Sequence, residues 1–85
     1  MARDNFILTF EFIILEQNGE IDEQHRQYTL EEGMVAAGKF LSLFINDPLK
    51  RVARVAIDTI PMVTLDSEKG MLWFGSHKKQ GVVKL

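Results

Sequence analysis

The segment Asn18–Asp22, with the sequence NGEID, has the oxygen donors and the glycine that a calcium-binding loop needs. A twelve-residue EF-hand loop takes oxygen ligands at positions 1, 3, 5 and 9, glycine at position 6 and a bidentate glutamate at position 12. With Gly19 at position 6, the first and last positions fall on Ile14 and His25, and neither is the required ligand. Because Asn-Gly between two alternating segments is the strongest short-range hairpin signal, the segment is instead predicted to be a hairpin turn.

The other residues that could do chemistry form no recognisable catalytic or metal-binding set. His25 and His77 are the only histidines, and neither has a second histidine or a cysteine at metal-ligand spacing. The sequence has neither a nucleophile elbow around a serine nor a glycine-rich phosphate loop. The adjacent carboxylates Glu31 and Glu32 are explained by helix capping. We therefore expect a protein that is not an enzyme and that has no metal and no cofactor.

The strongest candidate for ligand binding is the basic and aromatic stretch from Lys69 to Lys79. Aromatic side chains on a strand beside basic loops can stack on bases and hold phosphates. The stretch resembles the RNA-recognition-motif signature that begins Lys/Arg-Gly-aromatic, although Met71 and Leu72 depart from it and the second signature of that family is absent. A nucleic-acid-binding face would use Trp73, Phe74, Lys69, Lys78, Lys79, Arg51 and Arg54.

A packing role explains the same stretch equally directly. Trp73 and Phe74 are adjacent, so on a strand they point to opposite faces and at most one lies in the core. In this interpretation Trp73 is a core residue, Phe74 is partly covered, and the lysines keep the turn soluble. The acidic hairpin from Glu16 to Glu23 would also repel phosphate. Nucleic-acid binding is therefore the alternative hypothesis and not the first.

The segment from Asn5 to Glu16 is predicted to be a strand with two partly apolar faces. One face carries Phe6, Leu8, Phe10, Phe12 and Ile14, because side chains alternate along a strand. The opposite face is mixed, and its apolar residues exceed what a single helix on the first face can cover. Exposed apolar surface of this kind usually marks an interface. We predict a homo-oligomer or a protein partner, with Ile7, Ile13 and Leu15 at the interface.

The segment from Glu20 to Tyr28 is polar and is predicted to be the edge strand of a hairpin. A two-residue turn at Asn18-Gly19 would place Glu11 opposite Arg26, which suits their charges. It would also place His25 against the phenylalanine face of the first strand, which does not suit an imidazole. A longer loop would change the pairing, so the sequence leaves the register open.

A helix is predicted from Thr29 to Ile45. Thr29 and Glu32 form a capping box, in which each side chain bonds the backbone amide of the other residue. Asn46-Asp47-Pro48 ends the helix, because proline disfavours helical geometry in the residue before it. The predicted core-facing stripe is Leu30, Met34, Ala37, Leu41, Phe44 and Ile45, with Phe40 beside it. Gly33 and Gly38 weaken the helix, and either could allow a close approach to a sheet.

The C-terminal half is predicted to add three or four strands. Arg51 to Ile60 is β-branched and alternating, and Pro61 is expected to break the ladder or mark an edge or a bulge. Further extended segments follow at 62–65, 71–75 and 82–85, with loops at 66–70 and 77–81. The predicted fold is α+β in two layers, with a single helix on a mostly antiparallel or mixed sheet in the order β-β-α-β-β-β. In element order alone this resembles the β-grasp arrangement of ubiquitin-like domains, and a plain two-layer sandwich fits as well.

Length and composition limit the remaining possibilities. The 85 residues are predicted to form one domain, residues 1–85, and the apolar fraction of 46% argues against disorder. There is no cysteine, which excludes a disulfide scaffold and a thiol nucleophile. The longest apolar run, residues 6–15, is half a membrane span and a poor signal peptide. We expect a soluble cytoplasmic protein with no membrane partner.

The charge is divided unevenly along the chain. Residues 1–32 carry two basic and eight acidic side chains, a net −6, whereas residues 33–85 carry eight basic and four acidic side chains, a net +4. Opposite charge on two parts of one chain favours association with copies of itself or with a partner, unless the two signs only mark different solvated faces. The first expectation is a small non-enzymatic protein–protein interaction or regulatory accessory module that self-associates.

Overall fold

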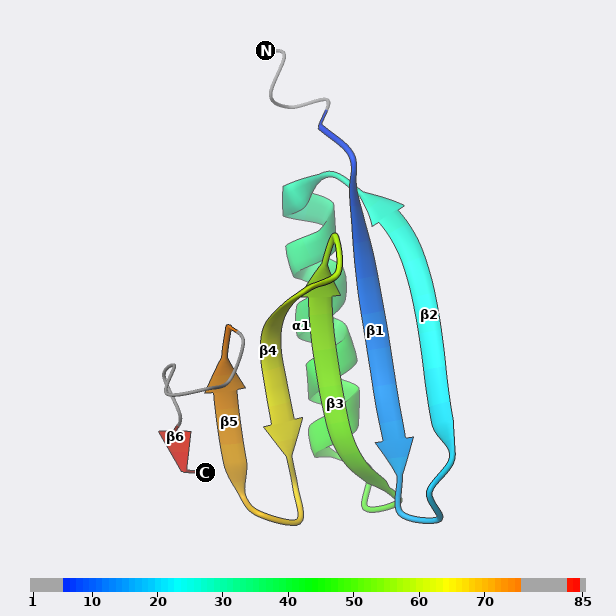
Figure 1. Ribbon diagram of the computed structural model, residues 1–85, viewed down its shortest axis with the longest axis vertical. Coiled ribbons are helices and arrows are strands. Elements are labelled where there is room, and N and C mark those ends of the chain that lie inside the picture. Colours follow the sequence, from blue (N-terminus) through cyan, green and yellow to red (C-terminus); the bar gives the residue numbers. More distant parts are fainter. Residues whose placement is uncertain (1–5, 76–82, 85) are drawn as a thin grey trace.

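The computed structural model describes residues 6–75 and the backbone of 83–84, and within these residues one helix packs on one face of a six-stranded sheet (Figure 1). The elements are β1 (Leu8–Glu16), β2 (Ile21–Tyr28), α1 (Leu30–Ile45), β3 (Lys50–Ile57), β4 (Ile60–Asp66), β5 (Met71–Phe74) and β6 (Val83–Lys84). The order of the strands in the sheet is β2-β1-β3-β4-β5-β6, and every described pair is antiparallel. The predicted two-layer α+β class and element order are confirmed. The neighbours of β1 in the sheet are β2 and β3, and not a strand from the C-terminal end. Of the two arrangements that fit the sequence, the β-grasp order and the plain two-layer sandwich, the molecule therefore has the plain sandwich.

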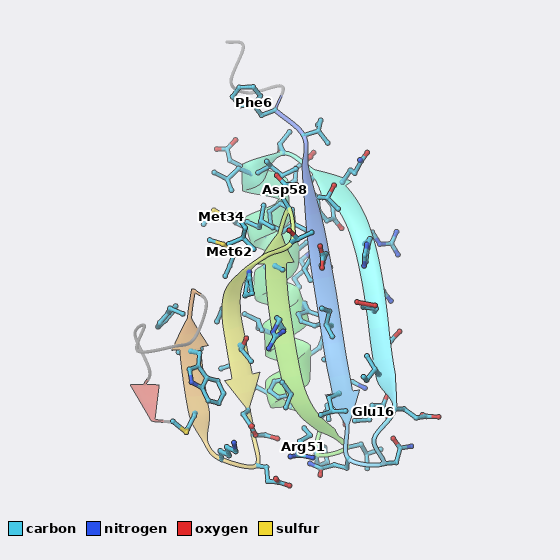
Figure 2. The ribbon with its side chains drawn as sticks, in the orientation of Figure 1. Phe6, Glu16, Met34, Arg51, Asp58 and Met62 are labelled. Atoms are coloured by element: carbon cyan, nitrogen blue, oxygen red, sulfur yellow. The ribbon has the colours of Figure 1, made fainter. Side chains whose placement is uncertain are left out.

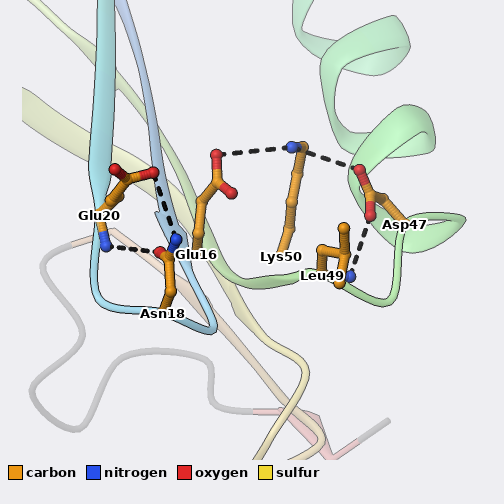
Figure 3. Close-up of polar contacts among 6 residues, drawn as sticks. All are labelled: Glu16, Asn18, Glu20, Asp47, Leu49 and Lys50. Carbon is orange, nitrogen blue, oxygen red and sulfur yellow. Dashed lines mark hydrogen bonds and ion pairs between the residues drawn. The ribbon is translucent and has the colours of Figure 1, made fainter.

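The turn between β1 and β2 is the hairpin turn predicted from Asn-Gly, with a loop of three residues. The Gly19 amide donates to the Glu16 carbonyl over 2.9 Å, and the Glu16 amide donates to the Glu20 carbonyl over 2.8 Å. Gly19 has φ +91°, as expected for the left-handed residue that follows a type I turn in such loops. The Asn18 side chain bonds both the amide and the carboxylate of Glu20 (Figure 3).

The register that a two-residue turn implied is wrong by one position. Glu11 pairs with His25, and Arg26 pairs with Phe10. A one-residue shift moves every side chain of a strand to the other face. His25 therefore leaves the phenylalanine face, which removes the mismatch that the shorter turn would have created.

The capping box and both ends of the helix agree with the sequence. The Glu32 amide donates to the Thr29 hydroxyl over 3.3 Å, and the Thr29 amide donates to the Glu32 carboxylate over 3.1 Å. The helix ends at Ile45, and Asn46 is its C-cap. Two backbone amides and one side chain then stabilise the connection to β3. Asp47 accepts from the Leu49 amide over 2.9 Å, and the Gln17 amide reaches the Leu49 carbonyl over 2.8 Å.

The face that α1 turns to the sheet differs from the predicted stripe. Phe44 is buried and Ala37 and Leu41 pack on the core, but Leu30, Met34 and Ile45 are 50%, 62% and 68% exposed. Gly33, Ala36 and Phe40 take the places of those three at the interface with the sheet. The helix is therefore rotated about its axis relative to the prediction.

A close contact at Gly33 accounts for this rotation. A Cβ atom at Gly33 would overlap the ring of Phe10, the most deeply buried large side chain, at 1% exposure. The glycine lets the helix backbone lie directly on that ring, and this contact brings Gly33 toward the sheet. A Cβ at Gly38 would meet nothing within 4 Å, so only the first glycine serves the close approach that the sequence suggested for either.

The strand predicted over Arg51–Ile60 is two strands in the structure. The chain turns at Asp58 and Thr59, which have φ of +50° and +68°, and Ile57 pairs with Ile60. Positive φ at both central residues defines a type I′ turn, for which Asp-Thr is an unusual sequence because β-branched residues are strained there. The Asp58 carboxylate accepts from the Thr9 amide over 3.0 Å, which attaches the turn to β1. Pro61 pairs with Ala56 beside a register shift at Val55/Ala56, so of the outcomes expected at this proline the structure has the bulge.

Candidate functional site

The sheet has one covered face and one open face. On the covered face, α1 lies against β1, β2 and β3, and the core residues Phe10, Phe12 and Val55 point toward it. The opposite face carries no helix within the described part of the chain and is turned to the viewer in Figure 1, where α1 lies behind the strands. We call this second surface the open face.

Side chains project from the open face of the sheet, which faces the viewer in Figure 2. The strand register arranges them in adjacent rows, two of which cross five strands. Strand register aligns the members of each row, and successive residues of the same face lie about 6.6 Å apart along a strand. The row nearer the β1–β2 turn contains Ile21, Leu15, Val52, Asp66 and Met71. The next row contains Glu23, Ile13, Arg54, Thr64 and Trp73. Apolar side chains thus flank a polar centre on both sides.

That polar centre is internally bonded. The Arg54 Nε donates to the Thr64 hydroxyl over 3.2 Å, and the side chain of Thr64 is buried beneath its neighbours. Asp66 is also buried, and its Oδ1 accepts from the amides of Glu68 and Lys69 over 3.0 and 3.1 Å. The Thr64 bond joins β3 to β4 and the Asp66 bonds hold the β4–β5 turn, so the two buried polar groups of this face have a structural role.

The residues predicted for an interface lie where a partner can reach them. Ile13 and Leu15 are half-buried on the open face, each between a β2 neighbour and a β3 neighbour. Ile7 precedes β1 and is 57% exposed. Their role in association stays a prediction.

The residues predicted for nucleic-acid binding are divided among several surfaces. Trp73 lies on the open face, separated from Arg54 by Thr64 alone. Phe74 points to the covered face and is 48% exposed, so neither aromatic is a buried core residue.

The basic residues of that prediction are dispersed as well. Arg51 forms an ion pair with Glu68 over 3.2 Å, and Lys69 is exposed in the β4–β5 loop. Lys78 and Lys79 lie outside the described residues, as does His77. The structure therefore brings together two of the seven predicted residues, Trp73 and Arg54.

Beside the edge strand β2, the covered face contains an open groove of about 390 Å³ that the sequence reasoning missed. Its apolar floor is formed by Phe12, Ile14, Ala36, Phe40, Leu43 and Phe44. Its polar rim includes Asp22, Gln24 and Arg26 from β2 together with Lys39 and Lys50. The available signal was the alternation of β2, which places its even-numbered polar residues on one face once the register is known.

Lys50, on the rim of this groove, forms ion pairs with residues outside the groove. Lys50 Nζ lies 3.3 Å from Asp47 and 3.9 Å from Glu16, so it connects α1 with the first hairpin (Figure 3). The pKa of the Asp47 carboxyl is lowered below its ordinary value. The main cause is the hydrogen bond that the Leu49 amide donates to it, and the second is the neighbouring Lys50.

Further observations concern metals and membranes. Within residues 6–75 and 83–84, no three His, Cys, Asp or Glu side chains gather where they could hold a metal ion. The same residues include no helix with both the length and the apolar character that crossing a membrane requires. Comparison with protein-family models, with curated proteins and with solved structures found no match. The functional argument therefore starts from the surfaces of this chain.

Proposed function

We propose that this protein is a small non-enzymatic interaction module that associates with a second copy of itself through the open face. The observation that carries the proposal is the apolar content of the sheet face that no described helix covers, where Ile13, Leu15 and Val52 lie together and Met71 and Trp73 lie on the other side of the polar centre. Two sheets that pack face to face interdigitate such side chains in a layer about 10 Å thick. A second copy supplies the same surface by symmetry.

The size of the open face supports a second copy as the occupant. Five strands at about 4.8 Å and seven residues at about 3.3 Å span roughly 24 by 23 Å, or about 550 Å² of flat area. Side-chain relief raises the accessible area toward the roughly 800 Å² per partner of a standard interface. A small domain also gains from association, because its own core buries only about 60–65% of the unfolded surface.

The test compares two substitutions that introduce the same charge. Ile13→Glu puts a carboxylate among the apolar side chains of β1 and β3 on the open face, whereas Val35→Glu puts one on an exposed position of α1. Sedimentation equilibrium of the wild type is expected to show association, with the dissociation constant raised at least tenfold by Ile13→Glu and unchanged by Val35→Glu.

Circular dichroism of both variants controls for folding. A wild type that stays at 9.7 kDa up to several hundred micromolar would overturn the proposal. So would an Ile13→Glu variant that is folded and associates as strongly as the wild type.

Trp73 and Arg54 on the same open face favour nucleic-acid binding as the second candidate function. Trp73 is the only tryptophan, so its fluorescence reports on that face alone. Saturable quenching by single-stranded oligonucleotides, weakened steeply by salt, is the expected signature of phosphate contacts. Unchanged fluorescence at low salt rejects this candidate and leaves the protein-interaction proposal intact.

A further inference from the structure

The edge strand β2 offers a second surface for association. Within the described residues nothing lies beyond β2 at its end of the sheet (Figure 1). Its pairing with β1 runs without a bulge from Ile21 to Tyr28, and it contains no proline and no lysine. Edge strands normally carry such features to prevent pairing with another chain. A long regular edge without them can accept a further strand.

The ionisable side chains of β2 are ordered by type. The acids Asp22 and Glu23 lie on one side of Gln24, and the basic residues His25 and Arg26 lie on the other. Asp22 and Arg26 point to the covered face, about 13 Å apart along the strand, and Glu23 and His25 point to the open face. Within the strand, His25 Nε2 lies 3.9 Å from Glu23 Oε2, and both side chains are about half exposed.

This order is self-complementary in an antiparallel pair, and we propose that two copies of the protein join through β2, with Gln24 facing Gln24 of the second copy. Asp22 then faces Arg26 of the second copy, and Glu23 faces His25 of the second copy. The two-fold axis repeats each contact. Side chains of opposite charge that face each other across two strands stabilise the strand pair. The pairing also uses almost the whole length of β2.

Neighbouring registers do not pair the charges. In a symmetric pair the same backbone edge of β2 faces outward in both copies. The partner of each residue can therefore change only in steps of two positions, and each such step moves the centre of the pair by one residue. Centring the pair on Glu23 places two carboxylates opposite each other, and centring it on His25 places two imidazoles opposite each other. The register centred on Gln24 is thus the one of these three in which each carboxylate faces a basic side chain of the second copy.

Protection of the edge is the competing explanation for the charges. Charged side chains, including inward-pointing ones, are among the features that keep an edge strand from pairing with another chain. Here the acidic and basic halves attract the reversed copy of the same strand. The groove beside β2 also supports this pairing. Arg26 and Lys39 both line it, and neither has an ion-pair partner among the described residues. Asp22 of the second copy would supply one.

The edge pairing rests on the proposed self-association, but it joins the two copies through the β2 backbone and the covered-face pair of Asp22 and Arg26, which the open-face contact does not use. An antiparallel pair with its two-fold axis perpendicular to the sheet joins the two sheets into one and puts both helices on the same side. The open faces then form one larger surface that is still available for packing. Edge and face contacts are therefore compatible and can be removed separately.

A single introduced thiol tests the register. The chain has no cysteine, so Gln24→Cys provides one thiol per copy at the predicted two-fold axis. Even-numbered residues of β2 turn their backbone groups toward β1, so this position is a non-hydrogen-bonded pair with Cα atoms about 4.5 Å apart, within disulfide range. Mild oxidation should convert most of Gln24→Cys to a disulfide dimer. Gln27→Cys, whose two copies lie about 20 Å apart in this register, should stay reduced.

Charge exchange tests the pairing, in the Ile13→Glu background that removes the open-face contact. Asp22→Arg and Arg26→Asp each place like charges opposite each other and should weaken self-association at least tenfold in sedimentation equilibrium. An equimolar mixture of the two variants pairs opposite charges at every site and should form a heterodimer. The double variant D22R/R26D should recover the homodimer.

The outcomes separate the two proposals. Folded single variants that associate like their parent, or a mixture no more associated than its components, overturn the edge pairing. A parent Ile13→Glu that is monomeric also overturns it, while association of the wild type keeps the proposed function. If Ile13→Glu associates like the wild type and the charge mixture forms a dimer, the open-face proposal fails and the edge pairing stands.

Discussion

The covered and open faces of the sheet differ in how their side chains are held. On the covered face, Phe10, Phe12 and Val55 are buried against α1, and Phe10 also contacts Gly33 and the ring of Tyr28. On the open face, Ile13 and Leu15 come from the same strand but are only half-buried by their cross-strand neighbours. One strand thus contributes both to a packed core and to a surface that a partner can complete.

This difference separates folding from association. Covered-face residues are expected to determine the stability of the monomer, since their burial occurs within one chain. Open-face residues are expected to contribute less to the monomer and more to the complex, since the remaining burial needs a second chain. Substitutions that are chemically alike on the two faces can break or sharpen this contrast.

The largest expected difference is between Phe10→Ala and Ile13→Ala. Phe10 is 1% exposed, so its truncation should lower the free energy of unfolding by about 3–5 kcal/mol. Ile13→Ala should cost only about 1 kcal/mol at concentrations where the protein is monomeric. Urea unfolding of dilute samples measures both. Equal losses would show that the open face belongs to the core of the monomer.

A glycine pair tests how closely α1 is held on the covered face. Gly33→Ala introduces a Cβ that overlaps the Phe10 ring, and overpacking of this kind should destabilise the protein by about 1–3 kcal/mol. Gly38→Ala meets nothing within 4 Å and should stabilise the helix by about 1 kcal/mol. Thermal unfolding of the two variants should shift in opposite directions. A stabilising Gly33→Ala would contradict the close contact between helix and ring.

The turn between β3 and β4 provides a reference that depends on neither face. Thr59 has φ +68°, which strains a β-branched residue and suits glycine. Thr59→Gly should therefore raise the free energy of unfolding by about 1 kcal/mol. Thr59→Ala keeps a Cβ in the same conformation and should change it less. If the alanine variant gains as much as the glycine variant, backbone strain is not the cause.

The smallest expected effect is the pH dependence contributed by Asp47 at the end of the covered side. The pKa of this carboxyl is lowered in the folded protein, chiefly by the Leu49 amide and then by Lys50. A lowered pKa contributes stability that is present above the unfolded value near 3.9 and is lost as the pH falls through the folded value. Between pH 6 and pH 3, Asp47→Asn should lose less stability than the wild type. Parallel pH profiles would contradict a favourable environment for the carboxylate.

Local signals in the sequence predicted the elements that depend on neighbouring residues. The Asn-Gly turn, the capping box at Thr29 and Glu32, and the irregularity at Pro61 each follow from backbone geometry within a few positions, and each is present. The open-face position of Ile13 and Leu15 followed from alternation along β1.

Signals that depend on distant residues were not readable in the same way. The Asp58-Thr59 turn was missed because the β-branched Thr59 disfavours positive φ, and the turn is held by the hydrogen bond that the Thr9 amide donates to the Asp58 carboxylate. The rotation of α1 was missed because a hydrophobic stripe containing Met34 and Ile45 is as regular as the one that is buried. Gly33 differs from the other residues of the helix because the Phe10 ring of β1 lies against it, and this contact depends on the tertiary structure.

The sequence by itself determined the α+β class, the order of its elements, the first hairpin and the helix with its cap, because these follow from propensity, capping and alternation over short distances. Tertiary structure decided the register of β2, and with it which face carries Asp22 and Arg26 and which carries Glu23 and His25. One residue more in the turn exchanges those faces, and the energy that selects the longer loop comes from contacts across the sheet. The order of charges along the edge was visible in the chain, but its meaning for a second copy depended on that register.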